Sequence, residues 1–248
     1  MYFVNLVCLG LKLMYFKAIL LDIEGTTTPI DFVHKTLFPY SWKRAHDFVQ
    51  SNLANLQDEI ASLHAQHKLD LAKGEFPPPF DEFSVESLTA YLHYLIDNDR
   101  KATALKSIQG QIWQAGYQSG EILGEIFDDV LPAFKRWKSE GKEIAIFSSG
   151  SVLAQKLIFG YSSSGDLTSY ISNYFDTTSG AKREPKSYQK IASKIGFPPV
   201  EILFVSDVIA ELTAASSAGM NCKLSVRPNN SPIENPLYFE SIYSFDEI

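Results

Sequence analysis

Phe16-Lys-Ala-Ile-Leu-Leu-Asp22-Ile-Glu24-Gly25-Thr-Thr27 is the stretch that decides the fold. Its apolar run ends in two acids spaced by two, followed by glycine and two hydroxyl residues. Such a run, bounded by turn residues, is typical of a buried parallel strand, and parallel sheets place their sites beyond the carboxyl ends of their strands. The stretch therefore predicts a parallel sheet with Asp22 at the mouth of a site.

The composition is that of a folded, acidic protein. The chain has 248 residues, of which 45% are hydrophobic and 21% charged, with a net charge of −7. This charge argues against a nucleic acid or an anionic membrane as partner, because both usually require a basic patch. Cys8 and Cys222 are too few for a disulfide framework or a zinc cluster. They indicate a reducing, cytoplasmic location.

The apolar run Tyr2–Leu11 resembles a signal peptide or membrane anchor, and we interpret it as neither. No basic region precedes it and no small-residue cleavage site follows it. Processing at Leu21 would also remove the strand that carries Asp22. We therefore predict that residues 1–13 are a dispensable extension and that Met14 is the natural start.

Beyond the first strand, the chain divides into a helical part and an alternating part. Helical periodicity covers 41–67, 84–96 and 103–120. After residue 129 the pattern predicts strands at 143–147, 202–205 and 222–226, and helices at 151–159, 187–195 and 211–218. This predicts an α/β fold: a doubly wound parallel-sheet core formed by 14–30 and 129–248, with 31–128 inserted as an all-helical cap domain.

Polar residues follow each apolar segment of the predicted core. They are Asp22 and Glu24, Ser148 and Ser149, Lys182, and Asp207. Because the carboxyl ends of parallel strands lie along one edge of a sheet, these residues are expected to share one pocket. Taken singly, each residue could have a purely structural role in a turn, in a helix cap or on the surface. Together, in this order, they predict phosphoryl transfer.

The acids predict a covalent mechanism assisted by a metal. Asp22 is the expected nucleophile, which attacks phosphorus to form an acyl phosphate. A divalent cation has to bridge the carboxylate and the phosphate, and oxygen ligands from Asp22 and Asp207 suit magnesium. Glu24 is placed to protonate the leaving oxygen and then activate water, while its backbone carbonyl faces the metal. Glu211, one turn past Asp207, is expected to orient the metal shell.

The remaining residues predict a cradle for the phosphoryl group. Ser148 and Ser149 stand between a strand and a helix, where hydroxyl and amide groups bind anions. Lys182 offsets the charge that builds on the phosphoryl group. Lys186 is an alternative to it, although the spacing to a following proline and tyrosine favours Lys182.

These motifs, in this order, resemble the four motifs of the haloacid dehalogenase superfamily. Glu24 departs from that pattern, because most members have aspartate there. Five segments narrow the resemblance to its enolase-phosphatase (acireductone synthase) family: Leu21-Asp-Ile-Glu-Gly-Thr-Thr-Thr-Pro-Ile30, Leu37-Phe-Pro-Tyr40, Asp99-Arg-Lys-Ala-Thr-Ala-Leu-Lys106, Phe147-Ser-Ser-Gly-Ser151 and Ala154-Gln-Lys-Leu-Ile-Phe-Gly160.

The resemblance implies a monomeric enzyme of methionine salvage with one Mg²⁺ per chain. It would enolise the small phosphorylated diketone 2,3-diketo-5-methylthiopentyl-1-phosphate, and then dephosphorylate it to the acireductone. The family's metal positions fall on Asp22, Glu24 and Asp207, and its substrate positions on Ser148, Ser149 and Lys182. The cap would close over the methylthio end, with Phe32, Phe38 and Tyr40 as apolar contacts.

Three points stay open at this stage. The enolisation base is Glu24, Asp31 or a cap residue. The nearest rival function is a phosphatase of the same superfamily that acts on another phosphorylated metabolite. The rival from another class is a non-catalytic phosphometabolite-binding protein, against which the intact Asp22, Lys182 and Asp207 argue.

Overall fold

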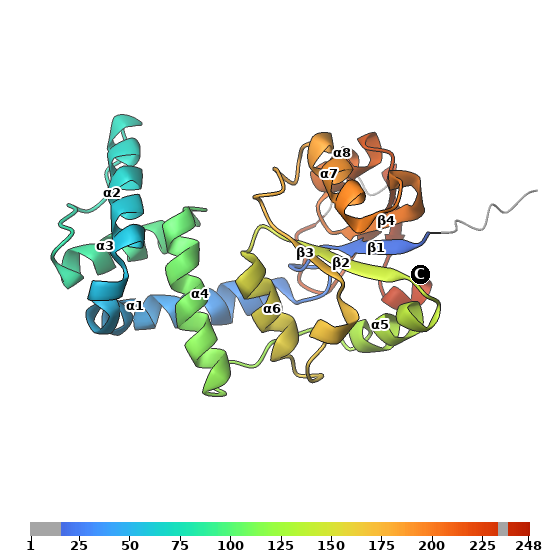
Figure 1. Cartoon of the computed structure of the whole chain (residues 1–248), viewed down its shortest axis with the longest axis horizontal. Coiled ribbons are helices and arrows are strands. Elements are labelled where there is room, and N and C mark those ends of the chain that lie inside the picture. The colour runs from blue at the N-terminus through green and yellow to red at the C-terminus, as the bar shows by residue number, and fades with distance from the viewer. Residues whose placement is uncertain (1–15, 233–237) are drawn as a thin grey trace, which may run out of the picture.

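A six-stranded parallel sheet, with helices on both faces, stands beside a separate group of helices (Figure 1). This computed structural model describes residues 16–232 and 238–248. The predicted extension, residues 1–13, lies outside the described residues, as does Cys8.

The sheet has the topology of a doubly wound fold. Its strands are β1 (Ala18–Leu21), β2 (Glu143–Phe147), β3 (Asn173–Phe175), β4 (Ile202–Ser206), β5 (Asn221–Ser225) and β6 (Glu240–Ile242). They lie in the order β3-β2-β1-β4-β5-β6, and every neighbouring pair is parallel. The strand order reverses between β1 and β4, which is the place where such sheets form their sites.

Alternate residues of β1 pack against different helical layers. Ile19 and Leu21 share a core cluster with α5 (Val130–Ser139) and α6 (Val152–Gly160). Ala18 and Leu20 share another cluster with α7 (Pro185–Ile195) and α8 (Ile209–Ser217). Figure 1 shows these two pairs of helices on opposite faces of the sheet. Because both faces of β1 are covered, its sequence is an unbroken apolar run.

The four helices that follow β1 have a hydrophobic core of their own. We call residues 32–118 the helical cap. It contains a π-helical segment (Phe32–Leu37) followed by α1 (Phe38–Asn52), α2 (Gln57–Ala72), α3 (Val85–Asp97) and α4 (Thr103–Gln118). Side chains from α1 to α4 form one buried cluster, whereas Trp113 and Tyr117 of α4 join the cluster under the sheet. Helix α4 therefore connects the cap to the sheet.

The structure differs from the predicted elements where elements are short or interrupted. The helical pattern predicted over 41–67 is two helices, because the 3₁₀ turn Leu53–Asn55 separates α1 from α2. Asn52 ends α1 and Asn55 ends the turn, and asparagine has a low helix propensity. Strands β3 and β6 have three residues each, too few to produce a recognisable period. Further 3₁₀ turns cover Thr168–Tyr170, Pro199–Glu201 and Phe245–Glu247.

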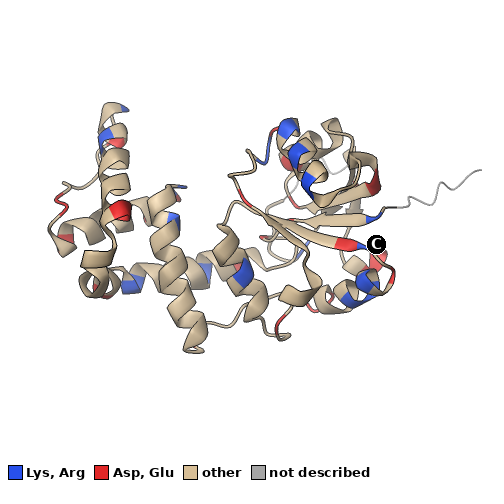
Figure 2. Cartoon of the chain, in the orientation of Figure 1, with Lys and Arg blue, Asp and Glu red and all other residues tan. Residues whose placement is uncertain are grey.

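Charged residues are distributed over both parts of the molecule. Figure 2 shows basic and acidic positions interspersed on the cap and around the sheet. Within residues 16–232 and 238–248, we find no helix whose length and hydropathy would let it span a bilayer.

Candidate active site

One polar cavity of about 410 Å³ lies at the carboxyl end of the sheet and brings together all six side chains singled out in the sequence. Its walls are formed by Asp22, Glu24, Ile30, Ser148, Ser149, Lys182, Asp207, Val208 and Glu211. These residues follow β1, β2, β3 and β4, so the parallel sheet gathers segments that are far apart along the chain.

The carboxylate of Asp22 is buried and held from three directions. Its Oδ1 accepts hydrogen bonds from the Ile23 amide at 2.8 Å and from the Lys182 ammonium at 2.7 Å. Its Oδ2 accepts from the Ser206 hydroxyl at 3.1 Å. Only 4% of the residue is exposed. These contacts fix one orientation of the carboxylate toward the cavity.

Lys182 lies between two acids. Its Nζ is 2.7 Å from Asp22 Oδ1 and 2.7 Å from Glu211 Oε2. Burial lowers the pKa of Lys182, but the charges of Asp22 and Glu211 outweigh burial and raise its pKa above the usual 10.5. Lys182 therefore carries a positive charge next to Asp22. Lys186, the alternative from the sequence, is exposed.

The loop that carries Lys182 is held by the start of α7. The Tyr188 hydroxyl donates to the Lys182 carbonyl oxygen at 2.7 Å, and the Ser187 hydroxyl donates to the Ala181 carbonyl oxygen at 2.7 Å. Both side chains are buried. The spacing of Lys182 and Tyr188, which favoured Lys182 in the sequence, therefore has a structural cause.

Glu211 contacts Lys182. This contact was not part of its predicted role, which was to orient the metal shell. Its Oε2 lies 2.7 Å from Lys182 Nζ and 3.1 Å from the Ser206 hydroxyl oxygen. Ser206 thus touches both Asp22 and Glu211. Ser206 was not predicted as a site residue, although it ends β4 just before Asp207 and was recognisable by that position.

Burial and the charge of Asp22 raise the pKa values of two other acids in the cavity, Asp207 and Glu24. Burial, and then the charge of Asp22, raise the pKa of Asp207 to about 7. The same two causes raise the pKa of Glu24, against the opposing charges of Lys101, Lys182 and His34. The cavity walls hold four carboxyl groups and one lysine ammonium, an excess of negative charge that favours the binding of a cation.

A tight turn at Gly25, just after β1, lies against Asp207. Gly25 has a φ of +66° there, and a Cβ added to it would lie 2.4 Å from Asp207 Oδ2. The backbone of the turn thus approaches the Asp207 carboxylate closely. Among the described residues, no side chain donates a hydrogen bond to Asp207, so its oxygens are available to an ion.

The donor set fits magnesium. In the described part of the chain, no three His, Cys, Asp or Glu side chains already converge as a complete ligand set. Magnesium does not need one, because it usually keeps several waters and binds one or two carboxylates. Asp22 and Asp207, with the Glu24 carbonyl oxygen, are hard oxygen donors of the required kind.

Ser148 and Ser149 follow β2 directly. The Ser148 amide donates to the Phe175 carbonyl oxygen at 3.1 Å, and its hydroxyl accepts from the Gly150 amide at 3.0 Å. The carbonyl oxygen of Ser149 accepts from the Lys106 ammonium of α4 at 2.9 Å. This serine loop is therefore held by the sheet on one side and by the cap on the other.

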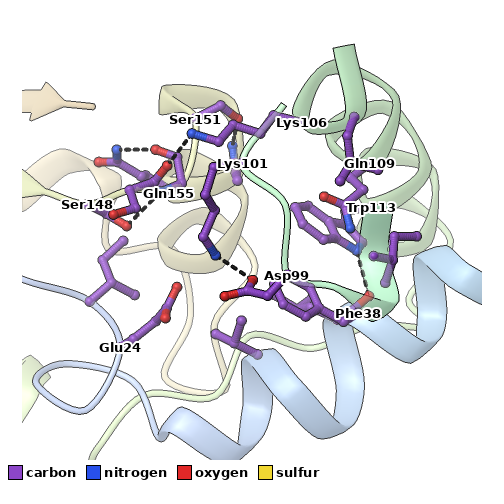
Figure 3. A pocket seen from close by; sticks show the side chains of 18 of the residues that line it. Glu24, Phe38, Asp99, Lys101, Lys106, Gln109, Trp113, Ser148, Ser151 and Gln155 are labelled. Carbon is purple, nitrogen blue, oxygen red and sulfur yellow. Dashed lines mark hydrogen bonds and ion pairs between the residues drawn. The ribbon is translucent and has the colours of Figure 1, made fainter. Parts of the chain in front are cut away.

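A second cavity of about 730 Å³ adjoins the first, between the cap and the sheet (Figure 3). Glu24, Ser148 and Ser149 line both cavities. Its other walls are largely apolar and include Leu37, Leu105, Trp113, Ala154 and Ile158.

Of the three aromatic contacts expected in the cap, only Phe38 lines this cavity. Phe32 is buried in the core under the sheet, with 2% of its surface exposed. The Tyr40 hydroxyl donates to Glu121, and the residue is not part of the cavity wall. The positions of Phe32 and Tyr40 were predicted wrongly, because their side chains leave the helix in other directions.

Comparison with known proteins identifies the family. The family model of haloacid dehalogenase-like hydrolases matches residues 16–219. Enolase-phosphatase E1 of Synechococcus elongatus is 50% identical over 232 residues, which are 93% of this chain and 96% of that protein. A probable bifunctional methylthioribulose-1-phosphate dehydratase/enolase-phosphatase E1 of Vitis vinifera is 44% identical over 246 residues, or 94% of this chain and 47% of that longer protein.

The fold is similar to that of a solved structure along nearly its whole length. The crystal structure of the UTR4 protein of Saccharomyces cerevisiae superposes with a TM-score of 0.76 at 36% identity, covering 94% of this chain and 100% of that one. With this agreement in sequence and in fold, the chain belongs to the enolase-phosphatase E1 family of the haloacid dehalogenase-like hydrolases.

Proposed function

We propose that this enzyme is an enolase-phosphatase of methionine salvage that acts on 2,3-diketo-5-methylthiopentyl-1-phosphate. It enolises the diketone and then removes the phosphate, producing the acireductone 1,2-dihydroxy-3-keto-5-methylthiopentene. One observation carries the proposal: a polar cavity suited to a phosphate adjoins a largely apolar cavity suited to a methylthio chain, and Glu24 lines both. The names of the relatives agree with it.

In the phosphatase half, Asp22 is the nucleophile. One of its carboxylate oxygens forms a bond to phosphorus while the bond from phosphorus to the substrate oxygen breaks, giving an aspartyl phosphate. Glu24 protonates the departing oxygen. It then takes a proton from the water that hydrolyses the aspartyl phosphate and restores Asp22.

Lys182 and the serine loop hold the phosphoryl group during both displacements. Lys182 already contacts Asp22 and carries a positive charge, so it offsets the negative charge of the transition state. Ser148 supplies its hydroxyl, because its amide already donates to Phe175, and Ser149 supplies its hydroxyl and its amide. One magnesium ion per chain, held by Asp22, Asp207 and the Glu24 carbonyl oxygen, would neutralise the repulsion between Asp22 and the phosphate.

In the enolase half, Glu24 is the base. The proton to be removed is on C1, the carbon that carries the phosphate oxygen, so one carboxylate can reach both the C1 hydrogen and that oxygen. Glu24 lies where the two cavities meet. Asp31, the alternative base, instead pairs with Lys35 and accepts from Asn229. It lines neither cavity.

The test is an assay of the purified chain with the diketo phosphate, with magnesium and with a chelator, in which enol and phosphate are followed separately. We expect both products with magnesium. Asp22→Asn should abolish phosphate release and the trapping of an acyl phosphate. Glu24→Gln should abolish enol formation, while Asp31→Asn is the matched control that leaves both steps unchanged.

Two outcomes would overturn the proposal. Equal turnover of plain sugar phosphates without an ultraviolet-absorbing enol would make the enzyme a general phosphatase. Binding of the substrate without either product would make the chain a non-catalytic phosphometabolite-binding protein. We also propose that the chain acts in the cytoplasm, as its two cysteines indicate, and that it is a monomer, as the family resemblance implies.

A further inference from the structure

A lysine of the cap stands on the wall of the apolar cavity, opposite the proposed base. Lys101 lies in the short segment between α3 and α4, and it lines the same cavity as Glu24. Figure 3 shows its side chain extending into the space between the serine loop and Glu24. Its charge acts on Glu24 ahead of that of Lys182.

The fold holds this segment in one orientation. Arg100 points into the cap, where its guanidinium lies 2.6 Å from the Asp70 carboxylate and also pairs with Glu75. Asp70 is fully buried and accepts from the Tyr91 hydroxyl at 2.7 Å. This buried network fixes Arg100, which lines the cavity beside Lys101, and so holds the backbone from which the Lys101 side chain extends.

Two more contacts position the ammonium group at the cavity. Lys101 Nζ lies 2.6 Å from Asp99 Oδ1 and 5.8 Å from the centre of the Phe38 ring. Asp99 has a φ of +46°, in the left-handed region, which aspartate tolerates better than most residues. Both partners of the ammonium line the cavity as well.

We propose that Lys101 is a catalytic residue of the enolase half, where it holds the oxygen on C2 as that oxygen becomes an enolate. The inference rests on the proposed function. The C1–H bond breaks and its proton goes to Glu24, the electron pair forms the C1=C2 double bond, and the electrons of the C2 carbonyl move onto its oxygen. With the phosphate in the polar cavity, C1 and C2 lie near Glu24, where the two cavities meet, and the C2 oxygen can reach Lys101 on the wall of the second cavity.

Phosphoryl transfer makes a different demand. Its negative charge is carried by the oxygens of the phosphoryl group, in the polar cavity, and Lys101 is not among the residues that line that cavity. Lys182 occupies that position instead. The two lysines therefore divide the two steps between them, and a variant of Lys101 should separate the steps.

The experiment measures the steps independently with Lys101→Met. Enolisation is followed in D₂O as exchange of the C1 hydrogens of the methylene-phosphonate analogue of the substrate, whose carbon–phosphorus bond the enzyme cannot hydrolyse. The phosphatase half is followed with p-nitrophenyl phosphate, which has no carbonyl group. Lys101→Arg keeps the charge, and Lys68→Met changes a lysine exposed on α2 of the same cap.

We expect Lys101→Met to slow C1 exchange by about 100-fold, the usual effect of removing one donor to an oxyanion, while hydrolysis of p-nitrophenyl phosphate is unchanged. Lys101→Arg should recover most of the exchange, and Lys68→Met should change neither rate. An unchanged exchange rate in Lys101→Met, or an equal fall of both rates, would overturn the inference. If the unmodified enzyme does not catalyse exchange, the proposed function itself is wrong.

Discussion

Gly25 is the residue on which the geometry of the acids depends most directly. Its φ of +66° is unfavourable for any residue with a Cβ, and a Cβ there would lie 2.4 Å from Asp207 Oδ2. We therefore expect Gly25→Ala to displace Asp207. Phosphatase activity should fall by about 100-fold, as misplacement of a group by about 1 Å can cause.

Gly74 provides the control for this substitution. Its φ is +79°, and nothing lies within 4 Å of an added Cβ. Gly74→Ala should lower the free energy of unfolding by about 1–2 kcal/mol, the cost of the left-handed conformation, and leave activity unchanged. Urea unfolding and phosphate release, measured on both variants, separate backbone strain from the clash. Equal activities of the two variants would contradict this account.

At the scale of single residues, the sequence predicted most of the candidate site. Asp22, Glu24, Ser148, Ser149, Lys182 and Asp207 each end or follow an apolar segment, and a parallel sheet brings such positions to one edge. Lys101 does not follow a predicted strand. It lies in a cap loop, and its approach to Glu24 depends on how the cap packs on the sheet, which no local pattern records.

At the scale of elements, α7 positions the loop that carries Lys182. Tyr188 is buried, and its hydroxyl donates to the Lys182 carbonyl oxygen. Tyr188→Phe leaves that carbonyl oxygen without this donor. We expect a loss of about 1–3 kcal/mol in the free energy of unfolding, together with slower phosphate release, because Lys182 loses its fixed position.

Tyr117 is the matched control. It is also buried, but its hydroxyl has no hydrogen-bond partner among the described residues. Removing an unpaired buried hydroxyl breaks no hydrogen bond, and it relieves the cost of keeping that hydroxyl away from water. Tyr117→Phe should therefore keep or raise the free energy of unfolding, measured by urea titration, and keep the activity. A larger loss of stability for Tyr117→Phe than for Tyr188→Phe would refute this interpretation.

The elements that the sequence predicted are the long ones. Strand β2 runs over the residues expected, Glu143–Phe147, and α7 ends at Ile195 before Gly196, whose φ is +92°. Such signals need several residues of regular pattern or a glycine at a helix end. Strands β3 and β6 are too short to have a regular pattern. They form because they pair with β2 and β5, and this tertiary pairing is not visible in the local sequence.

For the molecule as a whole, the cavity between the cap and the sheet should determine which phosphates are accepted. Removing the methylthio group from the substrate removes roughly the equivalent of two methylene groups. At about 0.8 kcal/mol each, kcat/KM should fall by about tenfold.

Two leucine variants test whether this cavity is the cause. Leu37 lines the cavity, whereas Leu63 lies in the cap's own core, and both are nearly fully buried. Each Leu→Ala change should lower stability by a similar amount, about 2–5 kcal/mol. Only Leu37→Ala should shrink the difference in kcat/KM between the two substrates, because only it changes the wall that the methylthio group contacts. If Leu63→Ala shrinks the difference as much, specificity arises from the stability of the cap and not from the shape of the cavity.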